Sequence, residues 1–264
     1  MLSEGTPGTL VLCYHAVSPT FPAPLSVTPE DLERQLVLLL RRGYVGATFS
    51  GALEDPDARR TLVVTFDDAY RSVLELGLPI LERLGVPGTV FAPTDHIGSD
   101  RPISWPGIDQ WLGGAHEHEL VPMSWAELGG LADRGWEVGS HTCSHPHLTQ
   151  IDDAALAGEL RRSKRRCEEA LGGECPSLAY PYGDHDARVV AATGAAGYQF
   201  AATLPTRLDA AGPLEVPRVG VYHRDGMQRF RLKVSPVLRA LRSSPAWAVL
   251  ERGRACAAVI RGRA

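Results

Sequence analysis

The sequence predicts an α/β fold, a distorted and incomplete (β/α) barrel of the TIM type with about seven strands. Apolar, strand-like runs alternate with segments of helical pattern, which is typical of a parallel sheet. The 264 residues, 44% of them hydrophobic, are enough for one large domain with a full core. An open, doubly wound sheet would give the same alternation and stays an alternative. The seven runs are TLVLCY (9–14), TLVVTF (61–66), GTVFAP (88–93), WEVGSH (136–141), SLAYPY (177–182), YQFAAT (198–203) and EVPRVGVY (215–222).

Helix signals lie between these runs. Thr28 can cap a helix that has Pro29 at its first position and acids in its first turn, and Gly43 ends it. Ser124 and Glu127 have the spacing of a capping box at the start of another helix. Two further helices are expected over about 70–84 and 153–171.

The predicted domain covers residues 8–225. Its segment at about 98–123 has no clear periodicity and is expected to be an inserted loop over the site. Residues 226–264 are predicted to form a basic helical extension, because Arg218–Ala264 holds eleven Lys or Arg and two acids in a chain of formal charge -4. Such an end predicts contact with an anionic membrane surface or a phosphate-bearing substrate, or else a solvated basic face. The segment lacks the regular interleaving of aromatic and basic residues that is typical of nucleic-acid binders, so no nucleic-acid partner is expected.

The cysteines indicate a reducing compartment. There are five, an odd number, and none forms a C-x-x-C pair, which argues against a disulfide framework and a thiolate zinc site. No stretch approaches the ~20 apolar residues of a membrane span, and residues 1–17 lack the pattern of an export signal. We therefore expect a cytoplasmic protein, with the basic segment as its one candidate for peripheral membrane contact.

Two clusters of polar residues follow strand-like runs. Asp67 and Asp68 end the run VVTFDD, where adjacent carboxylates are costly unless a cation offsets them. His141 and His145 end another run, and their spacing returns both side chains to one side. One carboxylate and two imidazoles leave open positions on a metal, as in zinc hydrolases and non-haem iron enzymes. Adjacent strand residues point in opposite directions, so one aspartate is expected to ligate and the other to stay free as a base.

Three motifs resemble the polysaccharide deacetylases with a NodB homology domain, also called carbohydrate esterase family four. TFDDAY (65–70) resembles the family motif T-F-D-D-G, SHTCSH (140–145) resembles H-[ST]-x-x-H, and AYPYGD (179–184) resembles R-x-P-Y. The resemblance covers about residues 8–225 in the family's order. It implies metal-dependent hydrolysis of an acetyl group, N-linked or O-linked, on a sugar.

The resemblance also implies roles for single residues. Asp67 would be the catalytic base, and the ligands of a divalent metal, usually zinc, with cobalt as an alternative, would be Asp68, His141 and His145. The backbone N–H of Tyr182 would stabilise the oxyanion, and His223 would protonate the departing amine unless it is an exposed loop residue. Substrate contacts are expected from His15, Pro181, Trp105 and Trp111, where packing roles for His15 and the two tryptophans are the alternative.

Two positions depart from the family motifs. Ala69 replaces a glycine, a change that a helix start should tolerate. Ala179 stands where the family has the arginine that orients the catalytic aspartate. This leaves Asp67 without its usual partner unless Arg218, or another late arginine, reaches it.

The expected function is removal of an acetyl group, usually N-acetyl, from an amino sugar or glycoconjugate by a metal-dependent hydrolase. Two alternatives remain at this point. One is a relative that hydrolyses a non-sugar amide such as a ureide. The other is a sugar-binding barrel with impaired catalysis, which the missing arginine at Ala179 and a His223 without a catalytic role would explain.

Overall fold

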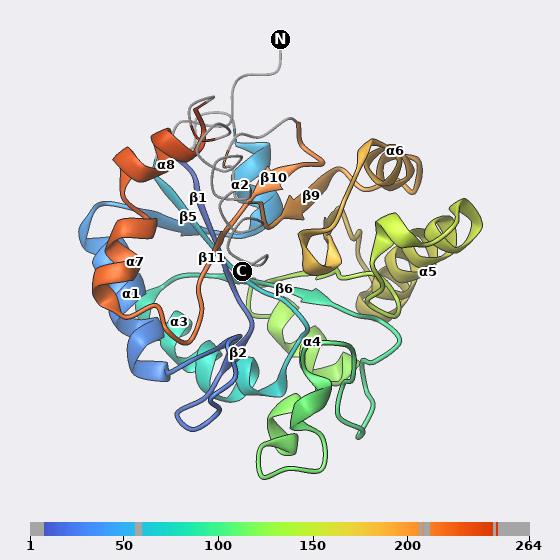
Figure 1. The fold of residues 1–264 in the computed structure, drawn as a ribbon, viewed down its shortest axis with the longest axis horizontal. Coiled ribbons are helices and arrows are strands. Elements are labelled where there is room, and N and C mark those ends of the chain that lie inside the picture. The colour runs from blue at the N-terminus through green and yellow to red at the C-terminus, as the bar shows by residue number, and fades with distance from the viewer. Residues whose placement is uncertain (1–7, 56–59, 206–207, 209–211, 245–246, 248–264) are drawn as a thin grey trace, which may run out of the picture.

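One parallel sheet curls into a nearly closed barrel surrounded by helices (Figure 1). The computed structural model describes residues 8–55, 60–205, 208, 212–244 and 247. Neighbouring strands run in the order β10-β9-β8-β7-β6-β5-β1-β11, and β4 pairs with β5 beside this path. The predicted distorted, incomplete (β/α) barrel is confirmed, and the open, doubly wound alternative is excluded.

All seven predicted runs contain strands of this sheet, and the last of them contains two. The short edge strand β4 was not predicted, because its sequence VGA carries no alternating or apolar pattern. A separate parallel pair, β2 (Ala16–Val17) and β3 (Ser26–Val27), lies beyond β1. The sheet consists of β1 (Leu10–Tyr14), β4 (Val45–Ala47), β5 (Thr61–Phe66), β6 (Gly88–Ala92), β7 (Glu137–Ser140), β8 (Ser177–Ala179), β9 (Phe200–Thr203), β10 (Val216–Pro217) and β11 (Val219–Gly220).

The helix starts follow the predicted caps. The Thr28 side chain accepts a hydrogen bond from the Asp31 amide, and Ser124 and Glu127 form both bonds of a capping box. The single helix predicted over 70–84 is wrong in one respect, since a π-helical turn over Val73–Gly77 precedes α3. Pro79 has no N–H to donate, which breaks the regular bonding pattern at this point. The helices are α1 (Pro29–Arg41), α2 (Phe49–Glu54), α3 (Leu78–Leu84), α4 (Trp125–Ala132), α5 (Asp153–Leu171), α6 (Ala187–Ala195), α7 (Met227–Lys233) and α8 (Pro236–Arg242).

The end of the chain packs on the barrel. Helices α7 and α8 form the described part of the predicted extension, and α7 contacts α1. Residues 248–264 of that extension lie outside the described residues. In the part of the chain that the structure describes, no helix combines the length and the apolar character needed to cross a bilayer.

Arg218 lies at the seam of the barrel. It separates β10, which pairs with β9, from β11, which pairs with β1, so the chain crosses from one edge of the sheet to the other at this residue. Its side chain is 1% exposed and donates two hydrogen bonds to Asp67, of 2.6 and 2.8 Å. Arg218 also donates to Thr65 Oγ1 and to the carbonyl of Thr203. One buried guanidinium therefore ties the seam to β5.

We expect Arg218→Met to lower the free energy of unfolding at pH 7 by about 3–5 kcal/mol, because Asp67 would remain buried and charged without a partner. Burial alone would raise the pKa of Asp67, but the Arg218 guanidinium brings it well below its usual range. That stabilisation exists above the unfolded-state pKa of about 3.9 and is lost as the pH falls below it. In Arg218→Met, the unpaired Asp67 carboxyl becomes neutral as the pH falls, which removes the cost of burying its charge. Urea unfolding at pH 7 and pH 4 should show the two proteins converging at the lower pH.

The matched control is Arg188→Met, which removes a surface pair with Asp153 whose side chains are 35% and 86% exposed. Its effect should stay below about 1 kcal/mol. If Arg218→Met lowers the free energy of unfolding at pH 7 by no more than this control does, the buried pair does not stabilise the fold.

Candidate active site

The polar residues predicted from sequence meet where the barrel strands end. Asp67 and Asp68 follow β5, His141 follows β7 and Tyr182 follows β8. Among the described residues, six non-glycine residues have a positive φ, and all but Arg60 lie in these strand-end segments. They are Asp68 (69°), Ala69 (54°), Thr142 (66°), His145 (61°) and Tyr182 (59°). Such clusters of strained backbone are typical of functional sites.

Ala69 corrects a prediction. It does not start a helix, because the chain forms a turn there and Ala69 takes a left-handed conformation. Glycine adopts this conformation without steric cost, whereas a residue with a Cβ costs roughly 1 kcal/mol or more. A glycine at this position of the family motif would adopt the left-handed conformation without strain, whereas Ala69 adopts it with a steric cost.

Asp68 is the centre of a group that can hold a cation. Its Oδ1 lies 3.5 Å from Nε2 of His141 and 3.6 Å from Nε2 of His145. The three side chains are buried, and one ligand atom from each lies within 4.8 Å of the others. Asp68 Oδ1 has no hydrogen-bond partner among the described residues. Burial and the neighbouring Asp67 charge raise the pKa of Asp68 well above its ordinary value, and a cation held by this group would offset both effects.

Both histidines present Nε2 to this carboxylate. The Nδ1 atom of His141 lies 2.8 Å from the Ala179 carbonyl oxygen, the kind of bond that fixes the tautomer of a metal-binding histidine. His145 is held by aromatic rings instead: Trp105 stacks on it at 4.1 Å and 18°, and Tyr182 meets it at 4.6 Å and 65°. Burial lowers the pKa of His141, and burial together with His141 lowers that of His145 to about 2. Both rings are therefore neutral, the form that binds metals.

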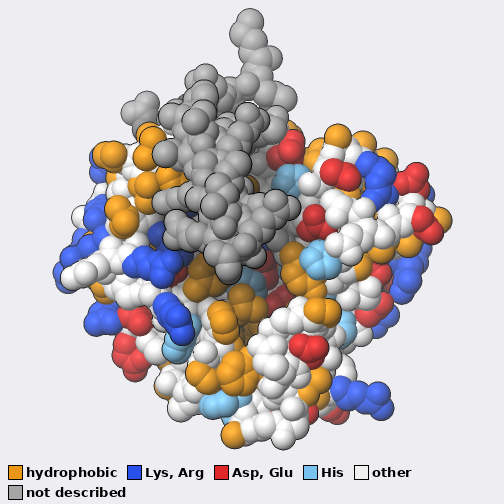
Figure 2. All heavy atoms as spheres, viewed as in Figure 1, with side chains coloured by type: hydrophobic (Ala, Val, Ile, Leu, Met, Phe, Trp, Pro, Cys, Tyr) orange, Lys and Arg blue, Asp and Glu red, His pale blue; other side chains and the backbone are white. Residues whose placement is uncertain are grey.

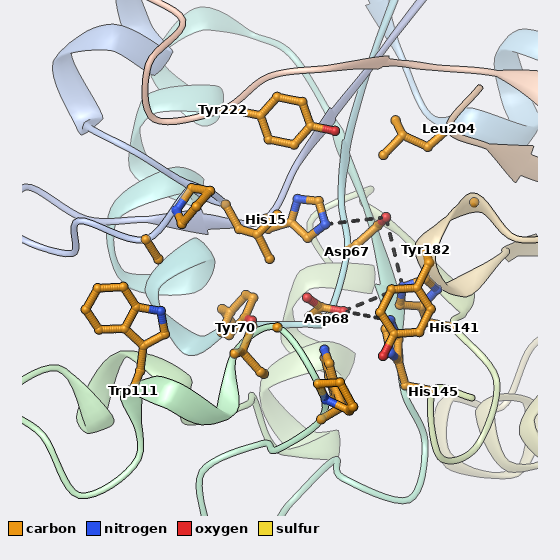
Figure 3. A pocket seen from close by; sticks show the side chains of 18 of the residues that line it. His15, Asp67, Asp68, Tyr70, Trp111, His141, His145, Tyr182, Leu204 and Tyr222 are labelled. Atoms are coloured by element: carbon orange, nitrogen blue, oxygen red, sulfur yellow. Dashed lines mark ion pairs between the residues drawn. The ribbon is translucent and has the colours of Figure 1, made fainter. Parts of the chain in front are cut away.

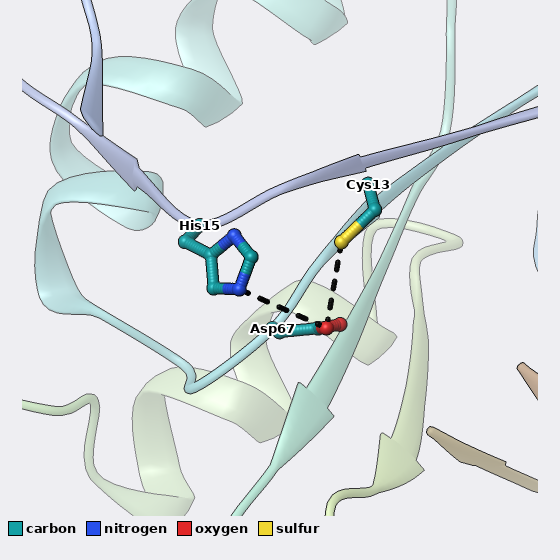
Figure 4. A group of neighbouring side chains, drawn as sticks. All are labelled: Cys13, His15 and Asp67. Carbon is teal, nitrogen blue, oxygen red and sulfur yellow. Dashed lines mark hydrogen bonds and ion pairs between the residues drawn. The ribbon is translucent and has the colours of Figure 1, made fainter. Parts of the chain in front are cut away.

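Asp67 has a different environment (Figures 3 and 4). Besides Arg218, it accepts a hydrogen bond from the Cys13 thiol at 3.4 Å, and its Oδ2 lies 4.0 Å from Nε2 of both His15 and His141. The arginine missing at Ala179 is thus replaced by Arg218, from another strand end.

Cys13, His15 and Asp67 also form a cluster of metal-binding residue types. The guanidinium on the same carboxylate disfavours a cation there, and burial keeps the thiol protonated by raising the pKa of Cys13.

A pocket of about 300 Å³ opens over these residues. Its charged or titratable floor consists of His15, Asp67, Asp68, His141, His145 and Arg218. Figure 2 shows hydrophobic side chains on the viewed face, below the atoms drawn in grey. Figure 3 places Trp111 on one side of the pocket, His141, His145 and Tyr182 on the other, and His15 and Tyr70 between them. The site is concave and partly apolar, as small-molecule sites generally are.

The remaining predicted residues are placed as follows. His15, Tyr182, Trp105 and Trp111 line the pocket, and Trp105 also stacks on His145. His223 is exposed and does not line the pocket, and its backbone N–H donates to the Pro24 carbonyl. Pro181 is buried and is not among the lining residues either.

Sequence reasoning missed Cys13, which contacts Asp67, and much of the pocket lining, including Phe21, Tyr70 and Tyr222. Tyr70 ends the TFDDAY stretch, and the other three lie near a strand end or in a loop outside the three motifs. Only the position of Cys13 two residues before His15, which puts both side chains on one face of the strand, was a usable signal.

Known proteins resemble this chain in sequence and in fold. The family model for polysaccharide deacetylases matches residues 54–201. The Bacillus subtilis protein YxkH, a candidate polysaccharide deacetylase, is 23% identical over 73% of this chain and 63% of its own length. A poly-beta-1,6-N-acetyl-D-glucosamine N-deacetylase of Staphylococcus aureus is 25% identical over 47% of this chain and 41% of its own length.

The chain therefore spans less than two thirds of these curated relatives. The crystal structure of a polysaccharide deacetylase from Bacillus cereus has the same fold, with a TM-score of 0.69 at 24% identity over 88% of this chain and 69% of that one. Since the family model covers more than half of the chain, and its match contains both the Asp67-Asp68 pair and the two site histidines, the chain belongs to the polysaccharide deacetylase family.

Proposed function

We propose that this protein is a metal-dependent hydrolase that removes the acetyl group from the nitrogen of an acetylated amino sugar. The proposal depends on one observation, the different environments of two adjacent carboxylates. Asp67 forms an ion pair with Arg218. Asp68 Oδ1 faces two histidine nitrogens and has no hydrogen-bond partner among the described residues. Membership of the family supports the reaction class. A Staphylococcus aureus relative that is named for deacetylating poly-N-acetylglucosamine supports the substrate class.

The donor set of Asp68, His141 and His145 fits a divalent metal, and we propose zinc. Two neutral imidazoles and one carboxylate are a common ligand set of catalytic zinc and leave a position open for water or substrate. When bound, the metal would polarise the acetyl carbonyl and lower the pKa of the attacking water, so that a weak base such as Asp67 suffices.

Asp67 is proposed as the base that takes the proton from the water. The Arg218 guanidinium keeps the pKa of Asp67 low, so the carboxylate is charged at neutral pH but is a weak base. Proton transfer to it therefore depends on a metal that acidifies the water. Two parallel hydrogen bonds from Arg218 also fix the plane of the carboxylate, leaving it little rotational freedom. Arg218 is thus a positioning residue. Its contact with Asp67 answers one of the two reasons for suspecting a catalytically impaired barrel, the missing arginine at Ala179. The other, the uncertain acid His223, is addressed by the proposal for His15.

His15 is proposed as the group that protonates the departing nitrogen, in place of His223. It is buried at the pocket floor with Nε2 4.0 Å from Asp67 Oδ2, whereas His223 is exposed outside the pocket. Burial lowers the pKa of His15 to about 4, so it enters the reaction neutral. The proton that Asp67 takes from water can then pass through His15 to the nitrogen, and the proton count of the hydrolysis balances.

Asp67→Asn should retain metal binding and lose about 10²–10⁴-fold in the rate of acetate release, because the amide cannot accept the proton. His141→Ala should lose metal and activity together. The measurement pairs acetate release from N-acetylglucosamine oligomers with metal content by elemental analysis. Normal turnover by Asp67→Asn would remove Asp67 from the role of base.

His15→Ala should lower kcat by about 10²-fold or more with metal content unchanged, whereas His223→Ala should stay within about threefold of the wild type. Acetate release under saturating substrate separates the two. The reverse pattern, with His223→Ala inactive and His15→Ala active, would restore the sequence-based assignment.

A further inference from the structure

The pocket has two chemically different halves. Its charged and titratable floor holds the residues discussed above, and no other lining residue carries a charged side chain. The rest of the lining is largely hydrocarbon and aromatic. This apolar wall consists of Phe21, Ala23, Pro24, Leu25, Ile108 and Trp111.

The apolar wall is built from two loops that hold each other. The ring of Phe21 meets that of Trp111 edge-on at 5.2 Å and 72°. Ser18 donates a 2.5 Å hydrogen bond to the buried Glu119, and its oxygen accepts from the Phe21 amide. The loop after β2 is thereby tied to the insertion that follows β6. These contacts fix the two loops to each other through the protein's own side chains, which limits the cost of ordering the wall on binding.

The position of His15 indicates which part of the substrate meets this wall. In Figure 3, His15 lies between the metal-ligand group and Trp111. A proton donor at His15 requires the departing nitrogen on its side of the pocket. The amino sugar that carries this nitrogen then extends toward Phe21 and Trp111, and the acetyl group points toward the opposite side.

A bare sugar chain does not suit this wall. Sugar hydroxyls that lose water need hydrogen-bond partners, and an unsatisfied hydroxyl is costly. Within the apolar wall, Trp111 Nε1 is the one side-chain donor, and it is buried without a partner among the described residues. The hydroxyl-bearing side chains of Tyr70, Tyr182 and Tyr222 belong to the rest of the lining. Hydrocarbon, in contrast, gains about fourfold in affinity for each methylene that it buries.

We infer that the substrate of this site is an amino sugar with a hydrocarbon chain on its aglycone side, an alkyl-type or lipid-linked N-acetylhexosaminide, which the apolar wall selects. The inference rests on the proposed function, because it takes the deacetylation site and the role of His15 as given.

The test compares two substrates that differ only in the aglycone, methyl and n-octyl N-acetyl-β-glucosaminide, at concentrations below micelle formation. With the zinc-loaded full chain, kcat/KM for acetate release should be at least tenfold higher for the octyl glycoside, mainly through KM. Octyl glucoside, which has the chain and no acetamide, should inhibit competitively. Equal kcat/KM for the two glycosides would overturn the inference and leave the deacetylase function standing. Absence of acetate release from both would overturn the function and the inference together.

Variants locate the effect on the wall. Trp111→Ala should reduce the octyl-to-methyl ratio to below about threefold, and Trp111→Phe should restore most of it. Leu112→Ala is the matched control, because Leu112 is adjacent, 38% exposed and outside the pocket lining. A ratio that is unchanged in Trp111→Ala would show that the preference arises elsewhere and would contradict the assignment to this wall.

Discussion

The buried ion pair between Arg218 and Asp67 is the interaction on which the site depends. Two charges removed from water are costly, and only good geometry with further hydrogen bonds offsets that cost. Arg218 meets both conditions through its two bonds to Asp67 and its contacts with Thr65 and Thr203. The result is an asymmetry between neighbours: the pKa of Asp67 is lowered and that of Asp68 is raised. Two identical side chains are thereby given different chemistry, a pattern that often separates acid, base and ligand roles.

The strained strand ends are the cost of bringing these groups together. Left-handed backbone costs roughly 1–2 kcal/mol at each residue with a Cβ. The turn between His141 and His145 is held by Glu159, whose carboxylate accepts hydrogen bonds from the backbone amides of Cys143 and Ser144. Helix α5 thus fixes from outside the loop that carries both histidines. The stability of the rest of the barrel therefore maintains left-handed backbone conformations at the site that these residues would not adopt on their own.

Features that depend on apolar runs and on short spacings between residues, such as strands and polar clusters at strand ends, could be predicted from the sequence. The strands were predicted from their apolar runs, and the meeting of the Asp67-Asp68 pair with His141 and His145 was predicted from their place at strand ends. Which of the two aspartates faces the histidines came only from the family resemblance. What depends on the path of a loop was not predictable. His223 follows a barrel strand like the site residues, yet the chain turns outward there and its amide pairs with Pro24. The conformation of Ala69 was hidden for the same reason, since a positive φ at a non-glycine residue leaves no sign in composition. Arg218 could be named only as one of several arginines, because its reach to Asp67 depends on closure of the seam.

The insertion at about 98–123 links specificity to the metal-ligand group. Trp105 and Trp111 belong to the same insertion, and one stacks on His145 while the other forms the apolar wall. His145 Nδ1 has no hydrogen-bond partner among the described residues, so the orientation of this ring depends on its aromatic neighbours rather than on a carbonyl of the kind that holds His141. A change in the insertion that moves Trp111 also shifts the support of His145. The loop that shapes the substrate pocket therefore cannot vary freely, because one of its side chains keeps a candidate metal ligand in place.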